Sequence, residues 1–150
     1  MNVPQNAEAL NPEPLSRDQY RQETRLPSAL ELRGRFPVGD QLTRQIAGHR
    51  EAIRRVLHGE DERTLIVVGP CSIHDEQAAL DYGRKLKALA DEVSDRFLIV
   101  MRAYLEKPRT TVGWKGLLYD PERTGKGDLK QGLERSRQLL LGLSELGLPL

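Results

Sequence analysis

The stretch of sequence that decides the fold is TLIVVGPCSIHD, residues 64–75. Its opening run, TLIVV, is β-branched or apolar throughout, and Gly69 and Pro70 end it. A short continuous run of this kind predicts a strand buried on both faces, as in parallel sheets. Asp75 then predicts the N-cap of a helix, because its carboxylate can accept a hydrogen bond from a backbone N–H of the first turn. The stretch therefore predicts the start of a βα unit.

The residues that follow repeat this pattern. A helix is predicted from Asp75 onward by apolar residues at helical spacing, namely Ala78, Tyr82, Leu86, Leu89 and Val93. The run FLIVM at residues 97–101 predicts a second buried strand. After a long loop, a helix from about Asp128 to Gly147 is predicted by a core-facing stripe of Leu129, Leu133, Leu140 and Leu143. The order β-α-β-α predicts parallel strands joined by a right-handed crossover.

The length of the chain sets the fold class that we expect. Two strands do not make a sheet covered on both faces, and residues 148–150 resemble the approach to a third strand. A (β/α)₈ barrel needs roughly 250 residues. We therefore expect an α/β fold in which residues 61–150 form the first two βα units of an incomplete (β/α)₈ TIM barrel.

The region before these units divides into two parts. Residues 1–26 hold prolines among polar side chains without an apolar period, which predicts a flexible N-terminal tail. Residues 27–60 predict a helical N-terminal extension: a short helix from Ser28 to Phe36, then a longer one with Asp40 as its N-cap and Gly59 at its end. The apolar side of the longer helix is Leu42, Ile46, Ile53 and Leu57.

Composition excludes several classes of protein. The 23 Lys and Arg residues balance 22 Asp and Glu residues, so the net charge of +1 gives no reason to expect nucleic-acid binding. The apolar runs are far shorter than the roughly 18 residues of a membrane span, and the polar N-terminus has no signal-peptide core. We therefore expect a cytoplasmic protein without a membrane partner.

The first candidate functional residue is the lone cysteine, Cys71. It lies between the carboxyl end of a predicted strand and the N-terminus of a predicted helix, where the helix dipole favours a thiolate. Three interpretations remain open from position alone: a packed cysteine, a nucleophile or a metal ligand. His74 is interpreted as a loop or capping residue.

The second candidate cluster follows the other predicted strand. Its charges are Arg102, Lys107, Arg109 and Lys115 against Glu106, which gives a local charge of +3. Such a cluster can bind a phosphate or a carboxylate. The alternatives are a solvated surface loop and a generic phosphate-binding α/β domain.

Together, GPCSIHD at residues 69–75 and EKPRTTVGWKG at residues 106–116 resemble the two N-terminal signatures of the type I 3-deoxy-D-arabino-heptulosonate 7-phosphate (DAHP) synthases. The similarity extends from about residue 26 to residue 150. The resemblance implies an enzyme that condenses phosphoenolpyruvate with erythrose 4-phosphate and releases phosphate, the first step of the shikimate pathway to aromatic amino acids. It also implies a divalent metal: Mn, Fe, Co or Zn.

The resemblance assigns roles to particular residues. Cys71 is expected to be a metal ligand, and Arg102 and Lys107 are expected to be catalytic and to bind phosphoenolpyruvate. The erythrose 4-phosphate site is expected to comprise Lys107, Pro108, Arg109 and Thr110. The family's other metal ligands, a His, a Glu and an Asp, belong to later strands that this sequence does not contain. We therefore expect an incomplete ligand set and an inactive isolated chain.

The resemblance also bears on partners and alternatives. The helical extension is similar to the one that in the family contributes to oligomer contacts and, in many members, to inhibition by an aromatic amino acid, so a homo-oligomer is expected at full length. Residues 121–128 depart from the Asp-Gly-Ser type of segment usual in the family. The alternative hypothesis is a non-catalytic interaction or regulatory module that associates with a partner through exposed strand edges.

Overall fold

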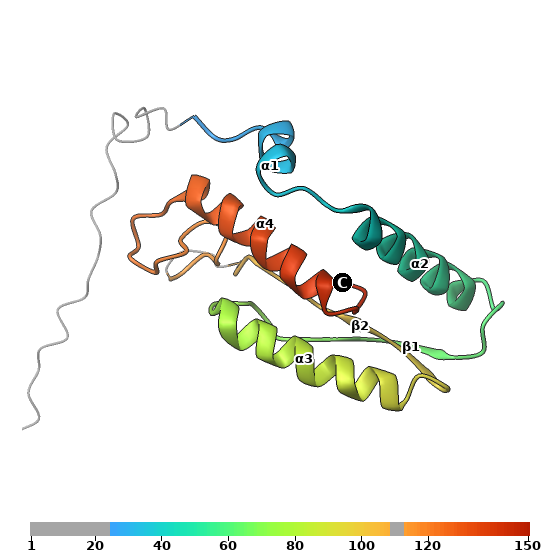
Figure 1. Ribbon diagram of the computed structural model, residues 1–150. Helices are drawn as coiled ribbons and strands as arrows, with labels where there is room; N and C mark the ends of the chain where they lie inside the picture. Colours follow the sequence, from blue (N-terminus) through green and yellow to red (C-terminus); the bar gives the residue numbers. More distant parts are fainter. Residues whose placement is uncertain (1–24, 109–112) are drawn as a thin grey trace, which may run out of the picture.

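The computed structural model describes residues 25–108 and 113–150, and this part is a mixed α/β fold with a small parallel sheet (Figure 1). Its elements, in chain order, are α1 (Ala29–Arg35), α2 (Asp40–Leu57), β1 (Thr64–Val68), α3 (Glu76–Glu92), β2 (Phe97–Met101) and α4 (Leu129–Glu145). β1 and β2 pair in parallel, with Thr64 opposite Phe97 and Val68 opposite Met101. The two predicted strands and their parallel pairing are confirmed. The predicted tail lies almost wholly outside the described residues.

Capping side chains define where most of these helices begin. The side chains of Ser28, Asp75 and Asp128 each accept a hydrogen bond from a backbone N–H in the first turn of α1, α3 and α4 respectively. The prediction of Asp40 as an N-cap is wrong, because Gly39 holds that position and Asp40 is the first helical residue of α2. Its negative charge there still complements the helix dipole.

The hydrophobic core lies where β2, α3 and α4 meet. Figure 1 shows α3 and α4 side by side, and the two helices are in contact with each other. The most deeply buried side chains are Met101 on β2, Leu143 on α4, and Leu117 and Leu148 in the segments flanking α4. Burial of such residues is the main favourable contribution to folding, at about 25 cal/mol per Å² of apolar surface.

The face that α3 turns toward the core differs from the prediction. Tyr82 and Leu89 are 37% and 48% exposed, so their predicted core positions are wrong. The buried residues of α3 are Ala79, Gly83 and Leu86. Gly83 explains the difference, since a Cβ atom there would lie 2.8 Å from the Leu146 Cδ1 atom. Small residues allow α3 to approach its neighbour closely, and the larger side chains are left on the flanks.

Helix α4 shows the same preference for small residues at close contacts. Its buried residues are Gly132, Ser136, Leu139 and Leu143, whereas Leu140 of the predicted stripe is only half-buried. A Cβ atom at Gly132 would lie 1.9 Å from the carbonyl oxygen of Leu118. The first turns of α4 therefore lie directly against the backbone of the preceding loop.

The helical extension is attached to α4. The guanidinium of Arg35 forms an ion pair with Glu134, and Gln45 Nε2 donates a 2.7 Å hydrogen bond to the carbonyl of Ser144. In α2, Leu42 is buried as predicted, whereas Leu57 is 70% exposed and does not face the core. Helices α1 and α2 thus contact the βα units through polar groups as well as apolar ones.

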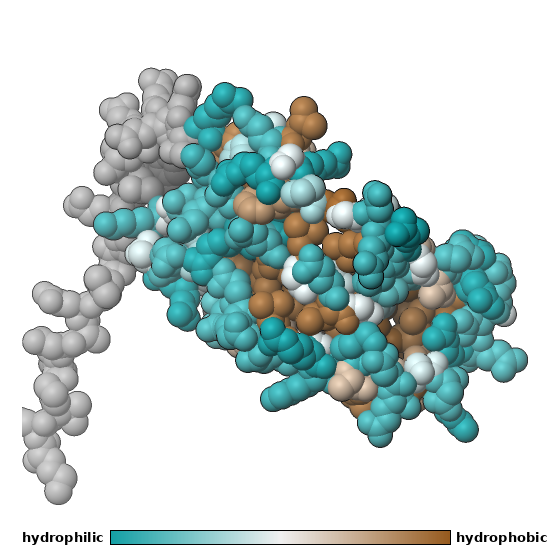
Figure 2. Space-filling model, in the orientation of Figure 1, coloured by the Kyte–Doolittle hydropathy of each residue, from teal (hydrophilic) through white to brown (hydrophobic). Residues whose placement is uncertain are grey.

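The prediction that β1 is buried on both faces is wrong for the described part of the chain. Val67 is 62% exposed, so the face of β1 on which it lies is not covered by the described residues. Figure 2 shows hydrophobic side chains reaching the surface along the middle of the face shown, with hydrophilic ones around them. Among the described helices, none has the length and apolarity to cross a membrane.

β2 has hydrogen-bond partners on both of its edges. The Arg102 N–H donates to the carbonyl of Val68, on the β1 side, at 2.9 Å. The Met101 N–H donates to the carbonyl of Pro149 at 2.8 Å. Because successive backbone N–H groups of a strand point to opposite edges, residues 148–150 lie beside β2 on the side away from β1.

Candidate functional site

The segments that follow β1 and β2 lie against each other at the carboxyl edge of the sheet. The Ile73 N–H donates to the carbonyl of Tyr104 at 2.8 Å, and the Ser72 hydroxyl donates to the carbonyl of Glu106 at 2.9 Å. Gly69 permits this approach, since a Cβ atom there would lie 2.3 Å from the carbonyl oxygen of Arg102. Parallel strands end at the same edge, which is where barrel and open-sheet α/β proteins place functional groups.

This edge brings Cys71, Arg102 and Lys107 together. Lys107 Nζ donates a 3.0 Å hydrogen bond to Cys71 Sγ, and the side chain of Cys71 is exposed. Arg102 Nη1 donates to the carbonyls of Pro70 and Cys71 at 2.7 and 2.8 Å. The Arg102 guanidinium also lies over the ring of Tyr104, 4.7 Å from its centroid, which favours a fixed orientation.

The two cations change the chemistry of the thiol. The hydrogen bond from Lys107 lowers the pKa of the Cys71 thiol, and the positive charges of Lys107 and Arg102 act in the same direction. A thiolate is the form of cysteine that binds metals or attacks electrophiles. Because the thiol is exposed and its charged form is favoured, the interpretation of Cys71 as a packed core residue is wrong.

The backbone of Lys107 is held by an extended segment that follows it in the chain. Residues 113–120, called here the return segment, run back along the residues that follow β2. The Lys107 N–H donates to the carbonyl of Lys115 at 2.8 Å, and Glu106 and Gly116 form an antiparallel bridge. Gly116 has a φ angle of 113°, and a Cβ atom there would lie 2.5 Å from the Glu106 Cα atom. The return segment therefore fixes the backbone of Lys107.

The remaining predicted substrate residues divide between described and undescribed positions. Pro108 is exposed directly after Lys107. Arg109 and Thr110 lie outside the described residues. His74 is exposed in the loop before α3, in agreement with its interpretation as a loop residue.

The metal ligand set was tested on the described residues. Across residues 25–108 and 113–150, no group of three or more His, Cys, Asp or Glu side chains could hold a metal ion. A divalent catalytic site in a protein generally uses three or more protein ligands. Cys71, with its favoured thiolate, therefore fits one position of a metal site, and the described residues do not complete that site.

A hollow at the other end of the sheet contains none of the predicted site residues. It has a volume of about 800 Å³, is widely open, and is lined by the loops before β1 and β2, including Arg63 and Arg96. In parallel α/β folds, functional groups gather at the carboxyl ends of the strands rather than at this end. The hollow therefore does not compete with the carboxyl edge as a functional site.

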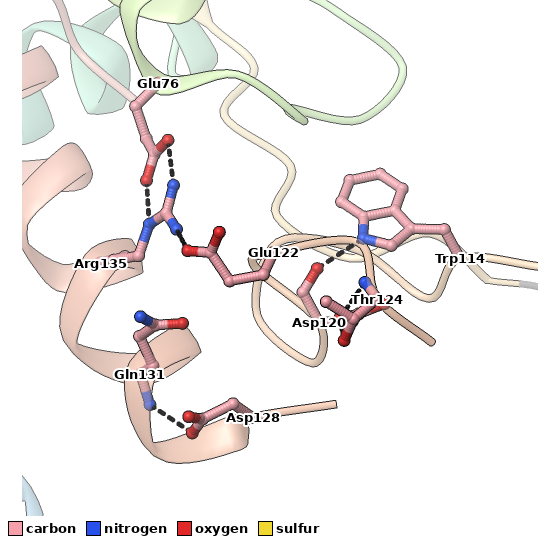
Figure 3. Close-up of polar contacts among 8 residues, drawn as sticks. All are labelled: Glu76, Trp114, Asp120, Glu122, Thr124, Asp128, Gln131 and Arg135. Atoms are coloured by element: carbon pink, nitrogen blue, oxygen red, sulfur yellow. Dashed lines mark hydrogen bonds and ion pairs between the residues drawn. The ribbon is translucent and has the colours of Figure 1, made fainter. Parts of the chain in front are cut away.

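The sequence analysis missed one group of residues beside the site, shown in Figure 3. Trp114 Nε1 donates a 2.7 Å hydrogen bond to the carbonyl of Asp120. The Asp120 carboxylate, in a residue only 7% exposed, accepts hydrogen bonds from the N–H groups of Thr124 and Gly125 at 3.1 and 2.9 Å. In the sequence, this group is marked by Asp120 followed by Pro121 and a glycine-rich turn.

With this geometry described, the chain can be compared with known proteins. The family model described as "DAHP synthetase I family" matches residues 35–149. The chain belongs to this family. The resemblance predicted from the two motifs is thereby confirmed.

Members of the DAHP synthetase I family from other organisms give the extent of the similarity. The Tyr-sensitive phospho-2-dehydro-3-deoxyheptonate aldolase of Escherichia coli (strain K12) is 53% identical over 120 residues, which cover 80% of this chain and 34% of that protein. The Trp-sensitive one from the same strain is 46% identical over 124 residues, 83% of this chain and 36% of that protein. This chain thus spans about a third of the length of these curated relatives.

A solved structure agrees with the sequence relatives. The structure of phospho-2-dehydro-3-deoxyheptonate aldolase from Francisella tularensis SCHU S4 superposes with a TM-score of 0.81 at 40% identity. The match covers 86% of this chain and 38% of that one. The arrangement of helices and strands described above is therefore one that a member of the DAHP synthetase I family adopts.

Proposed function

We propose that this chain is part of a DAHP synthase, in which it supplies the first two βα units of a (β/α)₈ barrel. The reaction is the condensation of phosphoenolpyruvate with erythrose 4-phosphate, with release of phosphate. The observation that carries the proposal is the 3.0 Å contact between Lys107 Nζ and Cys71 Sγ, beside Arg102, in a chain of this family.

The positive charges of Arg102 and Lys107 offset the repulsion between the two anionic substrates of this reaction. The two substrates carry two phosphates and a carboxylate, which repel one another when they are brought together. Arg102 offers a planar fork that suits a carboxylate or a phosphate, and Lys107 offers a compact positive charge. We assign both to phosphoenolpyruvate, and we assign Lys107, with Pro108, Arg109 and Thr110, to erythrose 4-phosphate.

The proposed metal would be held in part by Cys71. When bound, a divalent ion such as Mn, Fe, Co or Zn polarises the aldehyde oxygen of erythrose 4-phosphate. Within this chain, Lys107 keeps the thiol in the charged form that a ligand needs. The other ligands would come from outside the described residues, so the isolated chain is proposed to be inactive.

The names of the relatives support a proposal about regulation. The two Escherichia coli relatives are named Tyr-sensitive and Trp-sensitive. We propose that an aromatic amino acid inhibits the full-length protein as well, and that the full-length protein is a homo-oligomer. A cytoplasmic location is proposed from the sequence, whose apolar runs are short.

The test is phosphate release from phosphoenolpyruvate and erythrose 4-phosphate in the presence of Mn²⁺. We expect turnover from the full-length protein and none from residues 1–150 alone. Replacing Cys71 by Ala in the full-length protein should abolish turnover and lower the metal content after dialysis. Wild-type turnover and metal content in that variant would show that the ligand assignment is wrong.

A second function is supported by the exposure of β1. Within the described residues β1 pairs with β2 alone, and its other edge is open to pairing with another chain, as expected of a non-catalytic interaction or regulatory module. Absence of turnover in the full-length protein, together with a stable complex with an active synthase, would favour this module over the enzyme.

A further inference from the structure

We propose that Asp120 is a positioning residue for Lys107: its buried carboxylate fixes the turn that holds the return segment, and the return segment fixes the backbone of Lys107. The inference rests on the proposed function of Lys107. The residue itself lies outside the substrate positions assigned above, and it acts through the chain rather than on substrate.

The first step is the burial of the Asp120 carboxylate. Asp120 is 7% exposed, and its acceptors are used within the turn that follows. Oδ2 accepts from the Gly125 N–H at 2.9 Å and Oδ1 from the Thr124 N–H at 3.1 Å. Burial of a carboxylate costs free energy unless hydrogen-bond donors compensate for the lost water. The presence of Asp120 at this position therefore indicates that the turn depends on its carboxylate.

The second step is the unusual backbone of that turn. Arg123 adopts a φ angle of 57°, a left-handed conformation that residues with a Cβ atom rarely adopt. The Arg123 N–H donates to the carbonyl of Asp120 at 3.2 Å, so both the carbonyl and the carboxylate of Asp120 hold the same turn. Without the carboxylate, the turn would keep its strain and lose its hydrogen bonds from Thr124 and Gly125.

The third step links the turn to the return segment. The carbonyl of Asp120 also accepts the indole N–H of Trp114 at 2.7 Å (Figure 3). Trp114 directly precedes Lys115, whose carbonyl accepts the Lys107 N–H at 2.8 Å. A continuous set of contacts therefore leads from the Asp120 carboxylate to the backbone of the lysine that touches Cys71.

The return segment is also supported from its other side. Leu117 is 0% exposed, and the carbonyl of Leu118 lies against Gly132 of α4, where no Cβ atom could fit. The Asp128 N–H donates to the carbonyl of Tyr119 at 2.9 Å. The return segment is therefore held against α4 at Leu118 and Tyr119, and Asp120 holds the end that follows them.

The experiment measures amide hydrogen exchange at single residues in the full-length protein. Asp120→Ala should speed the exchange of the Lys107 amide by about tenfold, the change expected when a buried hydrogen-bond acceptor is removed. The amides of Leu139 and Leu143 in α4 should be unchanged. Asp120→Asn keeps one acceptor oxygen and should give an intermediate rate.

The matched control is Glu122→Gln. It removes a carboxylate of the same charge from the same turn, one that pairs with Arg135 and takes no part in the hydrogen bonds to Asp120. The Lys107 exchange rate should remain that of the wild type in this variant. An unchanged Lys107 rate in Asp120→Ala, or equal acceleration in α4, would overturn the proposal.

An activity measurement separates this inference from the proposed function. If the wild-type full-length protein is active, Asp120→Ala should lower kcat/KM for phosphoenolpyruvate by about tenfold, and Asp120→Asn should recover part of the loss. Unchanged kcat/KM alongside faster exchange would show that the positioning of Lys107 by Asp120 does not affect catalysis. If the wild type shows no turnover, the proposed function fails, while the exchange result still decides whether Asp120 positions Lys107.

Discussion

Strands β1 and β2 have similar apolar sequences, TLIVV and FLIVM, and lie in the same two-stranded sheet. Their surroundings differ: Val67 of β1 is 62% exposed, whereas Met101 of β2 is 1% exposed. β2 contacts β1, α3 and residues 148–150, while β1 contacts β2 and α2. Two strands of similar apolar sequence are therefore buried to different extents. The described residues cover β2 but leave part of β1 exposed.

The largest expected effect is on the free energy of unfolding, when a core residue is truncated and compared with a substitution in β1. Leu143→Ala should lower the free energy of unfolding by about 4 kcal/mol, because a fully buried leucine leaves a cavity when truncated. Val67→Thr should change it by less than about 0.5 kcal/mol, as exposed substitutions do. Urea unfolding of both variants provides the comparison. If Val67→Thr cost as much as the core variant, β1 would be covered in solution.

A smaller effect is expected from two glycines in different surroundings. Gly132→Ala should lower the free energy of unfolding by about 2 kcal/mol or more, since its Cβ atom would lie 1.9 Å from the Leu118 carbonyl oxygen. Gly48→Ala in α2 meets no atom within 4 Å and should raise it by about 0.5–1 kcal/mol. Thermal unfolding of the pair checks both signs, and destabilisation by Gly48→Ala would contradict this account of α2.

The smallest effect is expected from a substitution that changes the pKa of the Cys71 thiol. Lys107→Met should raise the pKa of the Cys71 thiol, because the hydrogen bond and charge that favour the thiolate are removed. At neutral pH the thiolate fraction then falls, and the pH profile of alkylation by iodoacetamide moves to higher pH. Lys115→Met is the control, since its side chain is not among the groups that shift this thiol. Equal profiles for wild type and Lys107→Met would be inconsistent with the contact.

Local sequence signals predicted the elements of the fold well. The runs at 64–68 and 97–101 are the observed strands, and Asp75, predicted as an N-cap, is the observed cap of α3. These features depend on hydrogen bonds and side-chain shape within a few residues, which is information that a single sequence contains.

The helix faces were harder to predict, for a physical reason. An apolar pattern favours large side chains as core residues, yet α3 packs through Gly83 and leaves Leu89 half exposed. Close approach of two helices depends on where a Cβ atom is absent, and that depends on the partner as much as on the helix itself. The same is true of Gly132 on α4.

The site was predicted in part. Position after the strands brought Cys71, Arg102 and Lys107 to one edge, and the described structure brings the three side chains together. Asp120 was not predicted, because its role depends on contacts with Thr124 and Trp114 that no helical or strand period reveals.

The hydrogen bond from Met101 to Pro149 has a consequence for biosynthesis. It places the segment after α4 beside β2, and in the proposed barrel the strands would then join the sheet in the order in which residues leave the ribosome. In the proposed barrel, the outer edge of β1 would pair only with the final strand, and the nascent protein would carry an unpaired valine-rich edge until translation ends. Such an edge is a site where a chaperone would bind, or where two unfinished chains would associate.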